Sequence, residues 1–344
     1  MKKRSVRCEK CGSISTLRNG HRKLRRGFIE RFYCRDCKGY FTLRINSNSR
    51  VGFAEKVRIT RTHLEGRTSI RTIARHSERS KTTVSKVIHE VSCQCVSPAW
   101  IARNLNPRWS GYLALDGKMI RVWDWAAKHF RYTREEKRWL HKMSLLLALD
   151  LGTLDIPDHH LGDDETAIDL IIFLQSLKKL GYPLKGYISD GNKDIEKAVK
   201  MTFGKVPHQL CIRHYLEGLK EKLGREEIAE FQYRDACQSL LAGARPKYLK
   251  VPSELFTYRK VKQLPPTNQQ IENLNRYLML RLKTIGQFQS FQSARDYCNA
   301  LTLMRRFIAF TDCRDKTKNN KAPLVIAGCN VNGLDYLALG KIRR

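Results

Sequence analysis

Three acidic residues stand where a carboxylate could bind a divalent cation. Asp116 lies within an apolar run, Asp190 ends a second apolar run, and Glu272 lies on an amphipathic segment. A carboxylate in an apolar strand is costly unless a cation meets it. Mg²⁺ takes oxygen ligands, and three carboxylates can bind two ions while leaving positions for water and phosphate oxygens. We therefore predict that these acids are catalytic ligands of two Mg²⁺ or Mn²⁺ ions, although each taken alone could be a strand-edge or helix-surface residue.

Two metal ions in such a site would support an in-line displacement at phosphorus. One ion activates the attacking oxygen and the other stabilises the leaving oxygen. Water as the attacking group would free a 3′-hydroxyl, and this hydroxyl could then attack a second phosphodiester in the same site. Such a site could therefore cleave a phosphodiester and join the freed end to another phosphodiester.

The acids fall in a segment that alternates between strands and helices. Strands are expected at 112–122, 143–151, 156–161, 184–189 and 206–211, and helices at 164–180 and 194–203. Three strands, a helix, a strand, a helix and a last strand form the order of an RNase H-like α/β fold, in which acids from two adjacent strands converge. The predicted fold is therefore a mixed five-stranded sheet with flanking helices.

Glu272 is expected on a late helix packed beside this sheet. Thr267 and Gln270 match a capping box, which predicts that the helix begins there. Glu254 is the main competitor for the third acid, but it lies in a segment that has a proline and no clear helical stripe. The long separation between Asp190 and Glu272 leaves room for a helical insertion.

Two cysteine pairs near the start of the chain have the spacing of a structural zinc site. Cys8-x-x-Cys11 and Cys34-x-x-Cys37 can each place two thiolates on one tetrahedral Zn²⁺. A module of this size buries too little apolar surface to fold without a metal. The spacing predicts a zinc ribbon, against the alternative of four unrelated buried cysteines.

A three-helix pattern follows the ribbon. Its third helix is predicted to begin at Ser80, and Val84, Val87, Ile88 and Val91 recur on one face of that helix. The other face is polar at its N-terminal half, as in the recognition helix of a helix-turn-helix, although a three-helix bundle used for dimerisation would look similar. The residues predicted to contact DNA are Lys81, Thr82, Thr83 and Lys86, together with Arg22 and Arg25 of the ribbon, which could also form a solvated basic face.

The composition favours a nucleic-acid partner. Lys and Arg outnumber Asp and Glu by 65 to 33, for a formal net charge of +32, and a folded protein this basic binds polyanions. No run approaches the roughly 20 apolar residues of a membrane-spanning helix, and no secretory signal is expected. The 11 cysteines are expected to be reduced thiols or metal ligands in a cytoplasmic, nucleoid-associated protein. Cys93 and Cys95, with no second pair nearby, are expected to be structural thiols.

Several motifs resemble those of a known enzyme family. They are Leu115-Asp116-Gly117, Ile188-Ser-Asp190-Gly191, Cys211-x-x-His214 and Thr267-Asn-x-x-Glu272-Asn-x-Asn275, with Arg281 and Phe288 downstream. In this order and spacing the chain resembles the DDE transposases of the Mutator-like superfamily, over most of residues 112–310. The resemblance implies a catalytic role for the three acids and a supporting role for Cys211 and His214. From the residues alone, a packing cysteine with a hydrogen-bonded histidine is as good an interpretation of that pair as a role in the active site.

The resemblance also implies the partners, which are the double-stranded DNA of transposon ends and target, bound by a homodimer or higher oligomer. Two other functions fit parts of the pattern: a non-catalytic DNA-binding regulator, and a two-metal nuclease that cuts without joining. The predicted divisions are a zinc ribbon at 1–46, a helix-turn-helix at 50–95, an RNase H-like core at 108–215 and 263–312, a helical insertion at 216–262 and a basic C-terminal tail at 313–344.

Overall fold

The computed structural model of the protein describes residues 14–24, 27–42, 51–122, 142–162, 166–285, 288 and 290–341. The chain divides into two compact units, Met1–Glu55 and Lys56–Arg344. No helix of the described part is both long enough and apolar enough to cross a bilayer. All three predicted catalytic acids lie in the second unit.

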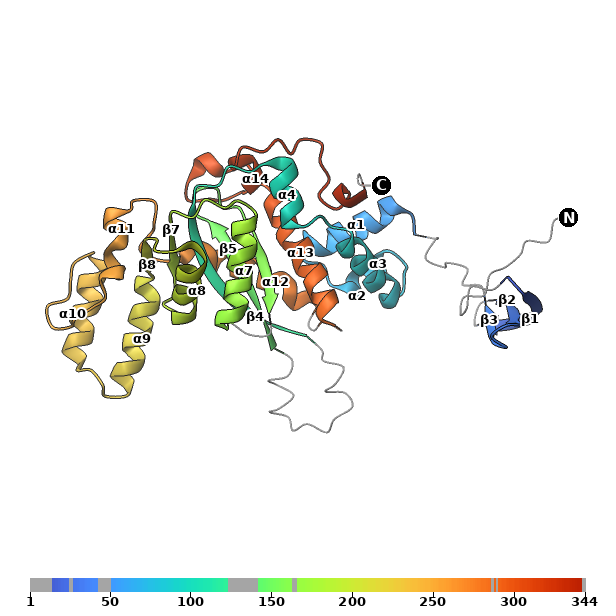
Figure 1. Ribbon diagram of the computed structural model, residues 1–344, viewed down its shortest axis with the longest axis horizontal. Helices are drawn as coiled ribbons and strands as arrows, with labels where there is room; N and C mark the ends of the chain where they lie inside the picture. Colours follow the sequence, from blue (N-terminus) through green and yellow to red (C-terminus); the bar gives the residue numbers. More distant parts are fainter. Residues whose placement is uncertain are drawn as a thin grey trace. The chain divides into compact units, whose positions relative to one another are not determined.

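The first unit contains a three-stranded antiparallel sheet. Its strands, in spatial order, are β1 (Thr16–Leu24), β2 (Gly27–Cys34) and β3 (Tyr40–Thr42) (Figure 1). Phe32, Cys34 and Phe41 form its small buried core. The backbone N–H of Cys34 donates to the carbonyl of Gly39 (2.9 Å), which closes the turn that carries the exposed Cys37.

The predicted zinc ribbon reaches beyond this sheet. Cys8, Cys11 and Arg25 lie outside the described residues, and the structure describes the backbone of Arg22 in β1 but not its side chain. The zinc ribbon and its two DNA-contacting arginines therefore stay predictions.

The second unit is built on a mixed five-stranded sheet. Its strands are β4 (Tyr112–Arg121), β5 (Lys142–Asp150), β6 (His159–Gly162), β7 (Gly186–Ser189) and β8 (His208–Leu210). They lie in the order β6-β5-β4-β7-β8, antiparallel from β6 to β4 and parallel from β4 to β8. This sheet and its flanking helices confirm the predicted α/β class and are consistent with an RNase H-like core (Figure 1).

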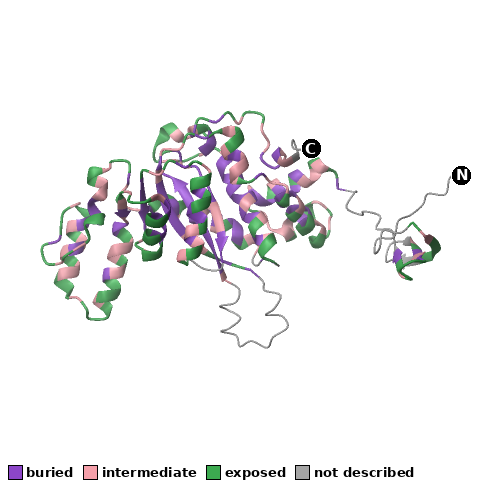
Figure 2. Cartoon of the chain, viewed as in Figure 1, coloured by how far each residue is buried: buried purple, intermediate pink, exposed green. Residues whose placement is uncertain are grey.

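The two faces of the sheet carry different side chains. Leu113 and Leu115 of β4 pack with α7 (Ala167–Lys179) and α8 (Lys193–Phe203) in a hydrophobic core, and the strands are largely buried (Figure 2). Because side chains alternate along a strand, Asp116 points to the opposite face. That face is covered by α12 (Gln269–Ile285), which contacts β4.

A helical insertion separates β8 from α12. Its elements are α9 (Ile212–Gly224), α10 (Glu230–Leu241), the 3₁₀ helix η2 (Ser253–Phe256) and α11 (Thr257–Lys260). Ile212, Leu240, Leu255 and Phe256 pack together in a small hydrophobic core of their own. Helix α9 begins at Ile212 rather than near residue 216, so the insertion includes residues that the sequence placed in the sheet domain.

The three predicted helices between residues 50 and 95 are present. They are α1 (Phe53–Leu64), α2 (Ile70–His76) and α3 (Lys81–Cys93), and α4 (Pro98–Leu105) follows them. The side chains of Ser69 and Ser80 accept backbone hydrogen bonds from Thr72 and Thr83, which fixes the starts of α2 and α3. The predicted apolar stripe of α3 is buried. Its use as a helix-turn-helix stays a prediction.

These helices do not stand apart from the sheet. Helix α3 packs against α13 (Phe291–Phe307), and the Arg281 Nε of α12 donates to the carbonyl of Leu64 at the end of α1 (2.8 Å). From Lys56 onward the segment belongs to the same compact unit as the sheet, whereas the sequence suggested a domain of its own. An apolar stripe marks the buried face of a helix but does not identify the element that covers it.

The described residues after 313 also pack onto this unit. They include η3 (Lys316–Lys318), α14 (Pro323–Ile326) and η4 (Leu339–Lys341). Leu324 and Leu337 are at most 1% exposed, and Asp335 forms an ion pair with Arg61 of α1 (2.7 Å). This packing differs from the basic tail predicted, because buried apolar residues lie between the lysines and arginines at the two ends of the segment.

A buried ion pair joins α13 to the loop between β5 and β6. Arg306 donates to both oxygens of Asp155 (2.8 and 2.7 Å), and Trp109 Nε1 donates to the same carboxylate (2.9 Å). The two charged side chains are 3% and 0% exposed. Removal of one partner would leave the other charge buried and unpaired, at a cost of about 3–5 kcal/mol.

We predict that Arg306→Met lowers the free energy of unfolding by about that amount, measured by urea denaturation. Lys316→Met is the matched control because it breaks the exposed Lys316–Asp312 pair and should change the unfolding midpoint little. Equal effects of the two substitutions would contradict the assignment of Arg306 as a structural partner of Asp155.

Candidate metal-binding active site

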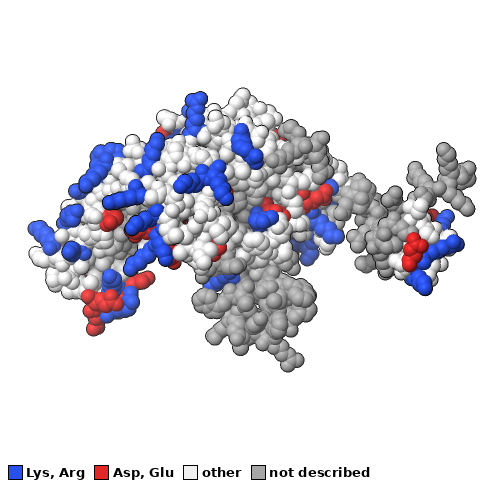
Figure 3. Space-filling model, viewed as in Figure 1, with Lys and Arg blue, Asp and Glu red and all other residues white. Residues whose placement is uncertain are grey.

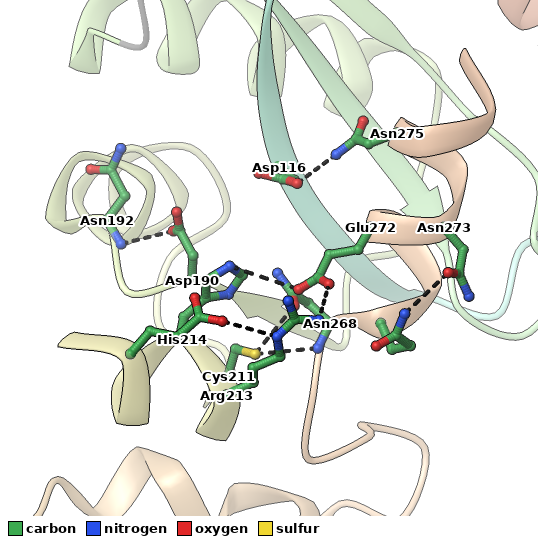
Figure 4. Close-up of polar contacts among 12 residues, drawn as sticks. Asp116, Asp190, Asn192, Cys211, Arg213, His214, Asn268, Glu272, Asn273 and Asn275 are labelled. Atoms are coloured by element: carbon green, nitrogen blue, oxygen red, sulfur yellow. Dashed lines mark hydrogen bonds and ion pairs between the residues drawn. The ribbon is translucent and has the colours of Figure 1, made fainter. Parts of the chain in front are cut away.

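The strand register places Asp116 and Asp190 side by side. Ala114 of β4 pairs with Ile188 of β7 in parallel register, and each acid lies two residues beyond its member of this pair. Asp116 is still within β4, whereas Asp190 follows the last residue of β7. The charge of Asp190 also acts on the carboxyl of Asp116. The two acids therefore lie on neighbouring strands, and Figure 4 shows them in the same region.

Helix α12 brings Glu272 to the same region. Asn275 lies one turn after Glu272, and its Nδ2 donates to Asp116 Oδ2 (2.5 Å). Residues three apart on a helix share a face, so the bond to Asn275 also positions Glu272 beside the strand that carries Asp116. Figure 4 shows the three acids, from β4, the end of β7 and α12, grouped around one region.

The start of α12 differs from the prediction. The backbone N–H groups of Ile271 and Glu272 donate to the carbonyl of Asn268 (3.1 and 3.2 Å), and the helix runs from Gln269. Asn268 therefore occupies the N-cap, and the predicted Thr267–Gln270 capping box is wrong. The side chain of Asn268 is buried and accepts a hydrogen bond from Cys211 Sγ (3.1 Å), which joins the start of α9 to the start of α12.

Cys211 and His214 lie beside Glu272, and each shifts the pKa of the other. Burial alone would raise the pKa of the Cys211 thiol, but its hydrogen bond to His214 and the charge of that ring outweigh burial and lower the pKa. The hydrogen bond to Cys211 raises the pKa of His214 against the opposing effect of burial, and Glu272 and Asp190 raise it further. His214 Nε2 lies 3.7 Å from Glu272 Oε1.

Cations surround the acids. Arg213 Nη1 bonds to Glu272 Oε2 (2.8 Å), and Lys118 Nζ lies 3.4 Å from Asp116 Oδ2. Burial raises the pKa of Asp116 and outweighs the opposing charge of Lys118. A basic side chain therefore lies close to Glu272, and another lies close to Asp116.

The donor atoms are of the type that a hard divalent cation takes, but the three carboxylates do not come within 4.8 Å of one another in the described part of the chain. Glu272 Oε1 and Asn275 Oδ1 are buried oxygens with no hydrogen-bond partner among the described residues. Such orphaned oxygens are rare in folded proteins, and a bound ion or water satisfies them. The three carboxylates supply oxygen ligands of the kind that Mg²⁺ prefers. The ligand atoms of Cys211, His214 and Glu272 do lie within 4.8 Å of one another, a softer set that suits zinc better than magnesium.

The other predicted site residues lie elsewhere. Three of the residues predicted to contact DNA are exposed on α3, as expected: Lys81, Thr82 and Lys86. The hydroxyl of Thr83 instead lies 2.9 Å from the hydroxyl of Ser80, which caps the start of the helix. Glu254, the competing acid, is exposed on η2 and accepts a hydrogen bond from its neighbour Ser253 (3.2 Å). It lies on a different element from the three grouped acids.

Three partners of the acids carried no predicted role. Lys118 could have been identified, because residues two apart on a strand share a face. Asn275 could also have been identified, since it lies one helical turn from Glu272. Arg213 gave no such signal, because 59 positions separate it from Glu272. No protein-family model and no curated protein matches the chain.

We predict that Cys211→Ser lowers the pKa of His214 toward its ordinary value of 6.5, measured by NMR titration of the imidazole. The fold now favours the protonated ring, so its stabilising effect is present below pH 6.5 and is lost as the pH rises through the folded-state pKa. Glu272→Gln should lower the same pKa by less, since its charge is a smaller cause.

Cys237→Ser, on α10, is the control and should leave His214 unchanged. A His214 pKa that is unmoved in Cys211→Ser would show that the thiol does not raise it.

Proposed function

We propose that the protein is a DDE-type DNA transposase that binds the ends of an insertion sequence and catalyses metal-dependent strand cleavage and strand transfer. The observation that carries this proposal is the grouping of Asp116, Asp190 and Glu272, from three separate elements, beside buried oxygens that lack partners. An acid set of this kind suits chemistry on phosphodiesters. The resemblance of the surrounding motifs to Mutator-like transposases adds to this support.

In this proposal Asp116, Asp190 and Glu272 bind two Mg²⁺ or Mn²⁺ ions. Bound there, the ions would activate the attacking oxygen and stabilise the leaving oxygen. Asn275 orients the Asp116 carboxylate through its hydrogen bond, and Arg213 and Lys118 supply positive charge to a phosphate that approaches the acids. Because burial raises the pKa of Asp116, protons compete with metal at this ligand to a higher pH than at an exposed aspartate.

The charge distribution supports a DNA partner. Figure 3 shows lysine and arginine side chains scattered over one face of the described part, with acidic side chains fewer and more local. Helices α7 and α8 expose Lys178, Lys179, Lys193, Lys197 and Lys200. A basic surface of this extent suits contact with phosphates over a long stretch of duplex. We extend the proposal to a helix-turn-helix in α1–α3, a structural Zn²⁺ at Cys8, Cys11, Cys34 and Cys37, and pairing of DNA ends by a homodimer or larger assembly.

The alternatives make different predictions. A non-catalytic regulator has no use for the buried, incompletely paired oxygens beside the three acids. A two-metal nuclease would need the same three acids, and a strand-transfer assay with a pre-cut 3′-hydroxyl end separates it from a transposase, because only the transposase joins that end to target DNA.

We predict that Asp116→Asn, Asp190→Asn and Glu272→Gln each abolish Mg²⁺-dependent nicking at the element's ends, because each removes a charged ligand of the proposed ions. The assay incubates the purified chain with its own flanking DNA and maps the cleaved strands, and binding of the same DNA should be largely unchanged. Glu254→Gln, at an exposed acid of the insertion, is the matched control and should nick normally. Normal nicking by any of the three active-site variants would contradict the proposed triad.

We predict that Lys81→Ala and Lys86→Ala each weaken DNA binding and reduce the slope of log K against log salt by about 1, because each lysine would neutralise one phosphate. Binding is measured over a range of salt concentrations. Lys222→Ala, at an exposed position of α9, provides a comparison outside the three-helix segment. An unchanged slope in both α3 variants would mean that this face of α3 does not contact DNA.

A further inference from the structure

We infer that His89, Cys93 and Asp296 form a second metal site, for zinc or a similar first-row ion, that joins α3 to α13. Cys93 Sγ lies 3.6 Å from His89 Nε2 and donates to Asp296 Oδ2 at 3.2 Å. The three possible ligand atoms lie within 4.8 Å of one another. This site does not depend on the proposed transposase activity.

The spacing of the ligand atoms matches a tetrahedral zinc ion. With Zn–S near 2.3 Å and bonds to nitrogen or oxygen near 2.0 Å, the sulfur should lie roughly 3.5 Å from each of the other ligand atoms. The observed distances from Cys93 Sγ are 3.6 Å to nitrogen and 3.2 Å to oxygen. Cys93 Sγ is almost equally far from both ring nitrogens of His89 (3.6 and 3.7 Å), so binding requires the imidazole to turn until one nitrogen points at the ion.

Both helices present their ligands suitably. His89 and Cys93 are four residues apart on α3, so their side chains share one face of the helix. Asp296 lies on α13, and Gln292, one turn earlier, donates to its Oδ1 (2.7 Å). This bond orients the carboxylate and leaves Oδ2 directed at Cys93, which is the usual role of an outer-sphere partner in metal sites.

The site is also accessible. His89 and Cys93 are exposed and Asp296 is half-buried, so an ion can enter and water can fill the fourth position. The metal takes the place of the thiol proton that Cys93 now donates to Asp296, and this proton passes to the solvent when the ion binds. A ligand set of sulfur, nitrogen and oxygen favours zinc over magnesium, which distinguishes this site from the three acids.

In this proposal Cys93 is a metal ligand rather than the structural thiol expected from the sequence. The sequence shows no second cysteine pair near Cys93, but the fold supplies Asp296 from 203 positions away. Cys93 is the last residue of α3, so an ion here would fix the end of that helix to α13. The DNA contacts predicted for α3 lie at its other end and would remain free.

The test is the number of zinc ions per full-length chain after equilibrium dialysis, measured by elemental analysis. We expect wild type to bind one more equivalent than Cys93→Ser or Asp296→Asn, with Cys95→Ser as the nearest-thiol control that keeps the wild-type number. Cys34→Ser, in the predicted ribbon, should lose a different equivalent, so the double variant Cys34→Ser with Cys93→Ser should lose two. Circular dichroism checks that each variant is folded.

Two further variants sharpen the result. Cys93→His replaces one zinc ligand by another and should retain the ion, whereas Gln292→Ala should weaken its affinity by about 10- to 100-fold. Unchanged zinc content in both Cys93→Ser and Asp296→Asn would overturn the proposal. Loss of the ion in Cys95→Ser together with its retention in Cys93→Ser would overturn it as well, because the ligand would then be the other thiol.

Discussion

The desolvated carboxylate of Asp116 is the constraint on which the candidate active site depends. It lies in the middle of β4 and is 9% exposed, and a charge so buried is costly unless other groups compensate it. The backbone N–H of Gly117 donates to Oδ1 (2.9 Å), Asn275 donates to Oδ2, and Lys118 lies nearby. Two of these partners come from β4 itself. The third partner, Asn275, comes from α12. The buried carboxylate of Asp116 is therefore stabilised in part by the packing of that helix on the sheet.

Other buried acids show what a purely structural carboxylate looks like in this fold. Asp150 accepts hydrogen bonds from the backbone and hydroxyl of Ser110, from the backbone and hydroxyl of Thr153, from the Gly111 N–H and from the Tyr182 hydroxyl. Both of its oxygens are saturated. Glu272 differs, because one oxygen pairs with Arg213 and the other has no hydrogen bond. The incomplete pairing of Glu272 is what the proposed role as a metal ligand would explain.

Local patterns predicted most of the framework. Strand alternation and helical periodicity depend on neighbours in the chain, so the five strands, the apolar stripe of α3 and the positions of Asp116 and Asp190 could be read from the sequence. What could not be predicted depends on contacts between distant segments. The bond from Cys211 to Asn268 and the closeness of Cys93 to Asp296 join residues 57 and 203 positions apart. The capping-box prediction was wrong for a related reason. Asn268, not Thr267, directly precedes α12, and its side chain accepts a hydrogen bond from the distant Cys211.

Helix α12 also links the acids to the three-helix segment. Its Arg281 is buried, stacks on Tyr277 one turn earlier, and donates to the carbonyls of Leu64 and Glu65 at the end of α1 (2.8 and 3.3 Å). These carbonyls are among the groups that a helix end leaves without an internal partner, so a cation is well placed there. Glu272 lies at the start of α12 and Arg281 in its second half, with the helix unbroken between them. The hydrogen bonds of Arg281 therefore connect the end of α1 to the helix that carries Glu272.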